Sequence, residues 1–234
     1  MTKAKVATAF VGAAMIFSSC STATGNGALI GTGGGALLGA IVGKLAGNTA
    51  VGAAVGAAVG AGTGAIIGKH MDKVKAETAA KLQNANVTEV TDANGLKAVK
   101  VTFNSGILFG SGNATLSSTA ASELTNFASV LKNNTDCSVA IQGYTDNDPW
   151  KGSTAEQSAQ KNLNLSQQRA DAVKSKLNSL GVSNSQIKSS TGYGEANPVA
   201  DNSSSAGKAQ NRRVEVYLYA SEAMINAANE GKLQ

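Results

Sequence analysis

The 234-residue chain is poor in the residues that build most catalytic and metal centres. It has one histidine, His70, and two cysteines, Cys20 and Cys137. Zinc centres need three or four clustered ligands, and the Ser-His-Asp and Cys-His schemes place a histidine beside the nucleophile. The sequence therefore predicts no catalytic residue, no metal site and no cofactor. His70 is interpreted as a solvated residue of a helix.

Aromatic residues are few and unevenly placed, and the charge is mild. All ten aromatic residues fall within 10–17 or 103–219, so the stretch between these ranges has no large ring to anchor a core. The formal net charge is +5, and no block of five like charges occurs. Nucleic-acid binders usually combine a basic patch with an aromatic platform, so we do not expect nucleic acid as a partner.

Glycine is abundant and clustered, with 15 of the 27 glycines between 25 and 68. Glycine has no side chain to bury and loses the most backbone entropy on ordering, so this segment is not an ordinary globular core. Two runs have period four, one from Gly31 to Gly47 and one from Gly52 to Gly68. On helices, this spacing makes a smooth face along which two backbones can approach closely.

The glycine spacing predicts a helical hairpin over 28–68. It resembles the glycine-zipper segments of several bacterial outer-membrane lipoproteins, which implies insertion into a membrane or assembly into a homo-oligomer. The alternative is a flexible spacer of low complexity, since each glycine costs a helix about 1 kcal/mol. Whether the smooth face meets lipid or another helix stays open. An amphipathic helix, interpreted as a linker, follows over 69–85.

The N-terminus has the pattern of an export signal. Two lysines precede a twelve-residue apolar run over 6–17, which is too short to span a bilayer. Residues 17–20, Phe-Ser-Ser-Cys, resemble the lipobox of bacterial lipoproteins, although leucine is more common at the position of Phe17. The resemblance implies a signal peptide over 1–19, acyl chains such as palmitate on Cys20, and a lipidated tether over 20–27.

Two alternatives to lipidation involve Cys20. In the first, the protein is exported in soluble form and Cys20 only happens to lie near the cleavage site. In the second, Cys20 forms a disulfide with Cys137. Cys137 alternates with Val139 and Ile141. We therefore interpret it as a small apolar residue on the buried face of a strand.

The chain from 86 onwards alternates between strand and helix patterns. Strands are predicted at 87–90, 96–103, 137–145, 187–193 and 212–219, with helices at 117–132 and 154–180. Asn94-Gly95 favours a hairpin between the first two strands. A capping box at Ser153 to Glu156 and a stop at Gly181 bound the long helix. These elements predict an α/β sandwich over 86–220, followed by a helix over 221–234 that caps the sheet or docks a partner.

Four spaced motifs in this half of the chain carry a specific resemblance. They are Gly143-Tyr144-Thr145-Asp146, Asn162-x-x-Leu165-Ser166-x-x-Arg169-Ala170, Gly192-Tyr193-Gly194-Glu195-x-Asn197-Pro198 and Asn211-Arg212-Arg213-Val214-Glu215-Val216. In this order they resemble the OmpA-like peptidoglycan-binding domain over about 102–219. The resemblance implies a β-α-β-α-β-β fold at the C-terminus, preceded here by the glycine-zipper hairpin. It also implies noncovalent binding of the cell-wall stem peptide through its diaminopimelate residue.

The resemblance implies a peptidoglycan-binding set made of Asp146, Arg169, Asn162, Thr145, Leu165 and Arg213. In that set, Asp146 matches the acceptor for the ligand ammonium and Arg169 the donor to its carboxylate. Diaminopimelate carries both groups on one centre, so an anion and a guanidinium facing each other suit it. The alternative is a structural salt bridge between Asp146 and Arg169. One of Arg212 and Arg213 must face outward, and Arg213 is included as the weaker candidate.

Two departures from the family pattern alter the expected site. Asp146 and Arg169 are about eight positions further apart than is usual, and residues 147–152 fill the enlarged loop. Trp150 in this loop either covers the ligand as an apolar wall or packs down on the domain. In addition, Gly110 follows Phe109 where many relatives have an acidic residue, which predicts that one polar contact is missing.

The sequence thus favours a noncatalytic lipoprotein of the outer membrane that binds peptidoglycan with a periplasmic domain and tethers the membrane to the wall. The first alternative is a membrane-inserting or oligomer-forming zipper protein that the wall-binding domain only positions. A wall hydrolase is a further alternative, with Asp146 and Asp148 or Glu156 as paired carboxylates. Loop acids two residues apart have no fixed relation, and a general acid needs a sheltered pocket, so no enzyme activity is expected.

Overall fold

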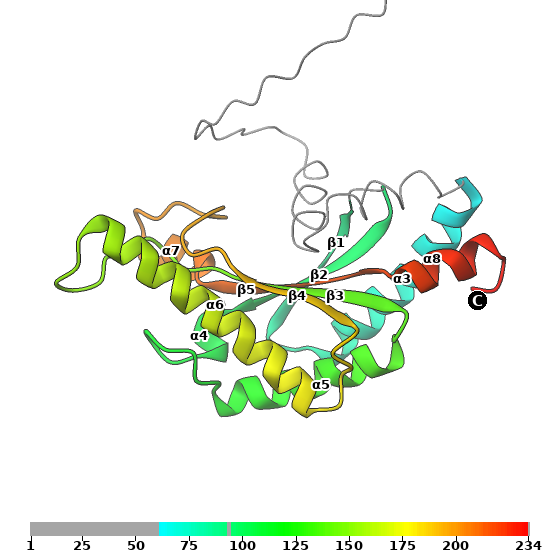
Figure 1. Cartoon of the computed structure of the whole chain (residues 1–234), viewed down its shortest axis with the longest axis horizontal. Coiled ribbons are helices and arrows are strands. Elements are labelled where there is room, and N and C mark those ends of the chain that lie inside the picture. The colour runs from blue at the N-terminus through cyan, green and yellow to red at the C-terminus, as the bar shows by residue number, and fades with distance from the viewer. Residues whose placement is uncertain (1–60, 93–94, 234) are drawn as a thin grey trace, which may run out of the picture. The chain divides into compact units, whose positions relative to one another are not determined.

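The structure is a computed structural model that describes residues 61–92 and 95–233. The predicted signal peptide, Cys20, the tether and the hairpin up to residue 60 lie outside the described residues. Helices and strands carry the labels of Figure 1.

A mixed five-stranded sheet forms the centre of the described domain (Figure 1). Its strands are β1 (Ala85–Thr91), β2 (Lys97–Asn104), β3 (Cys137–Gly143), β4 (Ile187–Gly192) and β5 (Arg213–Ala220). The spatial order is β1-β2-β5-β3-β4. Neighbouring strands are antiparallel except β3 and β4, which are parallel. The chain thus returns from β4 to insert β5 in the middle of the sheet.

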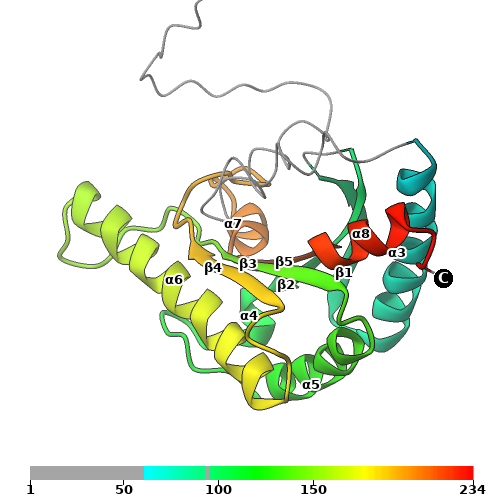
Figure 2. The ribbon, with the colours of Figure 1, turned by 45° about the vertical axis from the view of Figure 1, so that its right-hand side comes forward.

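Three long helices cover one face of this sheet. The helices are α3 (Ala61–Lys81), α4 (Ser105–Leu108), α5 (Ser118–Asn133), α6 (Ala155–Ser179), α7 (Ser205–Asn211) and α8 (Glu222–Asn229). α6 packs on β3 and β4, α3 packs on β1 and β2, and α5 lies between these two helices (Figure 2). From β2 to β5 the main elements run β-α-β-α-β-β, so the predicted fold class is confirmed.

The long helix α6 begins and ends where the local sequence can satisfy its free backbone groups. Thr154 and Gln157 form the capping box, one residue later than the predicted pair of Ser153 and Glu156. At the other end, Gly181 has a φ of +89°, which suits glycine, and Val182 N donates to Leu177 O at 3.1 Å. The predicted stop at Gly181 is confirmed.

The core lies between the sheet and its helices, and the alternation of strand residues builds it. Val99, Val101 and Phe103 of β2 point into it together with Val214, Val216 and Leu218 of β5. Phe103 meets Phe127 of α5 edge to face, with ring centroids 5.8 Å apart. Cys137 is 1% exposed in the same core, as expected for a small apolar strand residue.

Helix α3 is part of the domain and not a linker that leads into it. Ile67, Met71 and Val74 of α3 are buried in the main core. The predicted boundary between zipper and linker at 68/69 therefore falls inside one continuous helix. The amphipathic pattern of this segment is compatible with a linker helix and with a helix of the domain. An apolar stripe does not show whether it packs on a sheet or on a partner.

The last zipper glycines of α3 pack against the hairpin of β1 and β2. A Cβ atom built at Gly64 would lie 3.9 Å from the Leu96 side chain, and one at Gly68 would lie 3.6 Å from the Lys97 side chain. For this turn of the zipper, the smooth face meets the domain itself. No helix among residues 61–92 and 95–233 is long and apolar enough to cross a membrane.

The C-terminal helix closes the core at the end of β5. Met224, Ile225 and Ala228 of α8 are buried in the main cluster, and α8 packs on α3 and β5. Of the two predicted roles, capping the sheet is the one that the structure shows.

Two glycines set how closely α6 approaches the sheet. Gly143 and Gly192 are paired at the ends of the parallel strands β3 and β4. A Cβ at Gly143 would overlap the backbone carbonyl oxygen of Ser166, and one at Gly192 would overlap the backbone nitrogen of Gln167. Only glycine allows this contact, because any side chain would push the helix away.

We expect Gly143→Ala to destabilise the domain by about 1–3 kcal/mol, because the added methyl group must displace backbone rather than a flexible side chain. Chemical denaturation measures this free energy. Gly62→Ala is the control, since a Cβ at Gly62 meets nothing within 4 Å and alanine favours a helix. Equal stabilities for the two variants would contradict the close-approach account.

Candidate functional site

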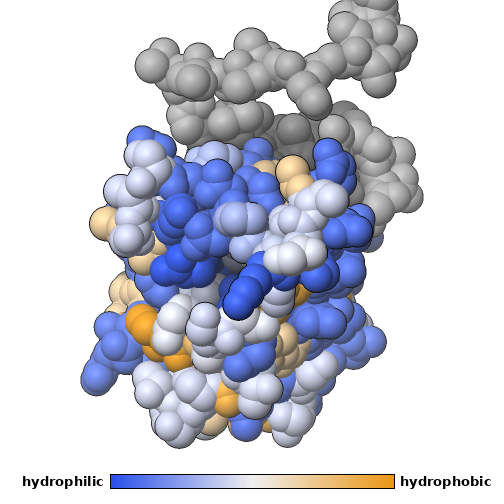
Figure 3. All heavy atoms as spheres, turned by 90° about the vertical axis from the view of Figure 1, so that its left-hand side faces the viewer, coloured by the Kyte–Doolittle hydropathy of each residue, from blue (hydrophilic) through white to orange (hydrophobic). Residues whose placement is uncertain are grey.

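A pocket of about 690 Å³ lies where α6, the loop after β3 and the α4 region meet. Its lining residues come from four segments: Ser105, Gly106, Phe109, Gly110, Ser111 and Gly112; Thr145, Asp146, Asp148, Pro149, Trp150 and Lys151; Asn162, Leu165 and Arg169; and Arg212. The end of the molecule that carries α7 and the start of α6 faces the viewer in Figure 3 and is mainly hydrophilic. A polar ligand suits a pocket in such a surface.

Asp146 lies in the loop that continues from β3. Beyond the strand, Tyr144 N donates to Arg213 O and Thr145 N donates to Gly194 O, so the backbone stays fixed up to the acid. The Asp146 side chain is 8% exposed and forms an ion pair with Arg212. Asp148 N also donates to its Oδ1 at 3.2 Å. The carboxylate is therefore buried, oriented and close to a cation.

Arg169 brings a second cation to the same pocket from α6. The residue is 3% exposed, its Nε donates to Asn113 O at 3.1 Å, and its guanidinium carbon lies 5.3 Å from the centroid of the Phe109 ring. Burial lowers the pKa of Arg169, Arg212 lowers it further, and Asp146 opposes both. Because the ordinary value is far above neutrality, the group stays charged.

No ion pair within residues 61–92 and 95–233 involves Arg169, whereas Asp146 pairs with Arg212. The predicted alternative, a structural salt bridge between Asp146 and Arg169, is therefore not what the structure shows. Gly110 lines the pocket, so no carboxylate comes from that position. A buried guanidinium without a carboxylate partner is suited to an anionic group of a ligand.

Arg213 does not line the pocket, in contrast to the sequence-based expectation. Its Nε donates to Glu215 Oε1 at 2.9 Å, and its guanidinium carbon lies 3.8 Å from the centroid of the Tyr144 ring. Arg212, one residue earlier, faces the pocket instead. The signal was present in the sequence, because Arg213, Glu215 and Tyr217 alternate on one strand face and the first two carry opposite charges.

Asn162 holds the enlarged loop against α6. Its Oδ1 accepts from the indole Nε1 of Trp150 at 2.7 Å, and its Nδ2 donates to Asp148 O at 3.2 Å and to Glu195 Oε1 at 2.8 Å. Both amide hydrogens are thus used within the protein. Asn162 is a positioning residue, and Trp150 lines the pocket while its N–H is bound to Asn162.

The remaining expected residues, Thr145 and Leu165, also line the pocket. Leu165 adds an apolar wall on α6. The hydroxyl of Thr145 is buried and finds no hydrogen-bond partner in the described part of the chain. A buried hydroxyl without a partner is costly, so a ligand acceptor or donor at this point would be favourable.

Comparison with models of known protein families matches two segments of the chain. Residues 108–212, which hold most of the pocket, match the model of the OmpA family. Residues 1–72 match the YMGG-like Gly-zipper model. The chain therefore carries an OmpA-family domain preceded by a Gly-zipper segment, and both predicted resemblances are confirmed.

Several curated proteins share this similarity. The "Probable lipoprotein YiaD" of Escherichia coli is 38% identical over 65% of this chain and 64% of its own length. The "Peptidoglycan-binding protein ArfA" of Mycobacterium tuberculosis is 38% identical over 48% of this chain and 32% of its own. The chain thus covers less than two thirds of the length of these relatives.

Two solved structures share the fold. A MotB-like protein from Desulfovibrio vulgaris has a TM-score of 0.56 at 20% identity, covering 68% of this chain and 96% of that one. The cell wall anchor of the T6SS from Pseudomonas aeruginosa has a TM-score of 0.51 at 26% identity, covering 64% of this chain and 97% of that one.

We expect Asn162→Ala to release the loop that carries Trp150. The chain has one tryptophan, so its fluorescence reports on this loop alone. The emission should shift to longer wavelength and become more accessible to a soluble quencher, because the indole loses its hydrogen bond and its packing. Gln160→Ala, which removes an exposed side chain of the same helix, is the control. Unchanged emission in Asn162→Ala would contradict the assigned role.

Proposed function

We propose that the pocket binds the peptidoglycan stem peptide through the diaminopimelate residue. The ligand ammonium is placed at Asp146, and the carboxylate on the same carbon is placed at Arg169. The observation that carries this proposal is that a buried anion and a buried guanidinium without a carboxylate partner line one pocket. Arginine suits the role because its planar fork bonds a carboxylate through two N–H groups.

Binding rearranges the charges that the free pocket already holds. Arg212 pairs with Asp146 and has an exposed fraction of 38%, so it can move away from the acid when an ammonium group arrives. Arg169 needs no such movement, because its Nε bond to Asn113 O keeps the guanidinium in place. We therefore assign orientation of the ligand to Arg169 and exchange of partners to Asp146 and Arg212.

The names of the relatives support a ligand of this kind. ArfA is named as peptidoglycan-binding, and the similar protein from Buchnera aphidicola is named "Peptidoglycan-associated lipoprotein". By similarity to these proteins, we assign wall binding to the OmpA-family domain.

We also propose that the protein acts without catalysis. The two carboxylates of the pocket are both engaged by cations, Asp146 by Arg212 and Asp148 by Lys208, whose Nζ lies 2.6 Å from Asp148 Oδ1. Glycoside hydrolysis requires one carboxylic acid in a sheltered, apolar environment and a second carboxylate at a fixed separation. The arrangement suits recognition of charged groups.

The proposed biological role is a tether between the outer membrane and the cell wall. Acyl chains on Cys20 anchor the N-terminus in the membrane, and the domain binds the wall on the periplasmic side. One acyl chain alone gives marginal membrane affinity, so stable anchoring needs more than one chain or a second membrane contact. The zipper segment before residue 61 is the candidate for a second contact.

The two attachments can be separated in cells that express the full chain. Arg169→Gln and Asp146→Asn should each reduce retention on purified sacculi by about tenfold or more, because each removes a charged hydrogen bond to the ligand. Cys20→Ser should release the protein from the membrane fraction and leave sacculus binding unchanged. Sedimentation of the two fractions and immunoblotting measure both effects.

Lys188→Ala is the matched control, because Lys188 is an exposed cation on β4 outside the pocket. Far-ultraviolet circular dichroism checks that each variant is folded. Retention of Arg169→Gln and Asp146→Asn at the level of the parent would contradict wall binding by this pocket. Release of Arg169→Gln from the membrane fraction would contradict the separation of the two roles.

A further inference from the structure

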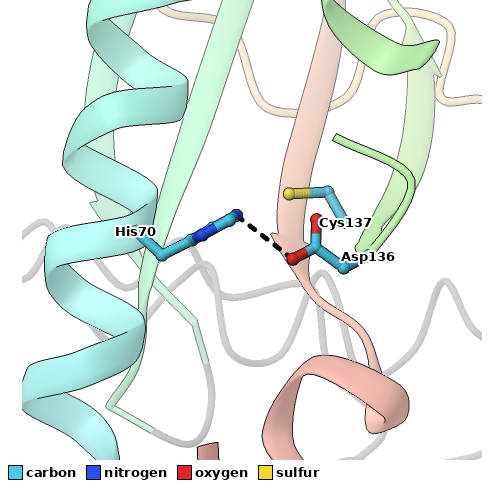
Figure 4. A group of neighbouring side chains, drawn as sticks. All are labelled: His70, Asp136 and Cys137. Carbon is cyan, nitrogen blue, oxygen red and sulfur yellow. Dashed lines mark ion pairs between the residues drawn. The ribbon is translucent and has the colours of Figure 1, made fainter. Parts of the chain in front are cut away.

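A second cluster of chemically active side chains lies away from the pocket. His70 on α3, Asp136 in the turn before β3, and Cys137 at the start of β3 point toward one another (Figure 4). One ligand atom from each, the imidazole nitrogen, a carboxylate oxygen and the sulfur, lies within 4.8 Å of the other two. The sequence predicts no such group, because 66 positions separate His70 from Asp136.

The imidazole of His70 is incompletely satisfied in this cluster. Its Nε2 lies 3.2 Å from Asp136 Oδ2, and the His70 side chain is 17% exposed. The nitrogen atom is nevertheless buried and has no partner with hydrogen-bond geometry among residues 61–92 and 95–233. A buried ring nitrogen that faces a carboxylate and a thiol without a bond of its own fits a metal ligand.

The backbone around the cluster is held rigidly. Glu77 of α3 accepts hydrogen bonds from the side chains of Asn133 and Asn134 at 2.8 and 2.9 Å, so α3 is tied to the turn before β3. Ser221 N donates to Asp136 O at 3.2 Å from the other side. The side chains therefore come from fixed elements, which is what a preorganised metal site needs.

We propose that His70 Nε2, the Asp136 carboxylate and the Cys137 thiolate bind one divalent transition-metal ion of the zinc type. Zinc takes imidazole, thiolate and carboxylate ligands in tetrahedral geometry, with ligand atoms about 3.5 Å from one another. The three ligand atoms lie within 4.8 Å of one another in the free protein, so binding of the ion would draw them closer together. Three protein ligands leave a fourth position for water.

The sulfur side of the site is soft and apolar. Met71 Sδ lies 3.9 Å from Cys137 Sγ, and both residues are 1% exposed. Soft sulfur ligands select zinc and cuprous ions over magnesium and calcium, which prefer oxygen. The ligand set therefore suits a borderline or soft ion such as zinc.

Binding the ion changes the protonation of the thiol. Burial, assisted by the Asp136 carboxylate, raises the pKa of Cys137 well above its usual range, so the free protein holds a protonated thiol at neutral pH. When the ion binds, the sulfur forms a bond to it and the S–H proton passes to the buffer. The thiolate and the carboxylate then balance the two positive charges of the ion.

Titration of the full chain with zinc chloride in the presence of a chromogenic chelator tests the proposal. The protein is purified without a polyhistidine tag and kept reduced. We expect one ion per chain, and His70→Gln and Cys137→Ala should each weaken binding by at least about tenfold. Cobalt in place of zinc should show the sulfur-to-cobalt absorption band in the parent and lose it in Cys137→Ala.

Two control variants separate this site from other binders of zinc. Asp72→Asn removes an exposed carboxylate of α3 two residues from His70, and Cys20→Ser removes the other cysteine. Neither should change the affinity. His70→Gln alters a partly exposed side chain, so it tests the site even if Cys137→Ala fails to fold. Equal zinc affinity of the parent and His70→Gln, or loss of binding in Cys20→Ser, would overturn the proposal.

Discussion

The close packing of α6 on the ends of β3 and β4 determines where the charged side chains of the pocket lie. Gly143 and Gly192 are paired in the sheet and let the backbone of residues 166 and 167 rest against both strands. Arg169 lies one turn after Ser166 on this helix, and Asn162 lies one turn before Ser166. Both line the pocket. The loop after β3 brings Asp146 to the same pocket. The two glycines thus allow the helix that carries Arg169 and the loop that carries Asp146 to lie close together.

The electrostatics of the pocket follow from this packing. Arg169 is buried without a carboxylate partner among the described residues, while Asp146 shares its charge with Arg212. Leaving a guanidinium unpaired inside a protein is costly unless a ligand supplies the missing charge. The enlarged loop is also held in place. The side-chain amide of Asn162 forms hydrogen bonds with Trp150, Asp148 and Glu195, which fix the wall of the pocket.

Much of the fold was predictable from the sequence, because hydrophobic periodicity and caps report local structure directly. The strand pattern, the α5 and α6 helices and the stop at Gly181 rest on such signals. The orientation of Arg212 was also predictable, because Arg213 alternates with Glu215 on one strand face and carries the opposite charge, which leaves Arg212 for the other side. Two features needed the three-dimensional structure. An apolar stripe does not say what covers it, so the pattern of α3 fits a linker as well as a helix of the domain. Long-range pairing brings Asp136 to His70, and no local signal encodes that.

We propose that Arg169 binds the carboxylate on the free end of diaminopimelate. The most direct test measures the affinity of the parent and of Arg169→Gln for two stem peptides, one with that carboxylate free and one with it amidated. We predict that amidation weakens binding to the parent by about tenfold or more and leaves binding to Arg169→Gln unchanged. Equal losses on amidation in both proteins would show that Arg169 does not contact this carboxylate.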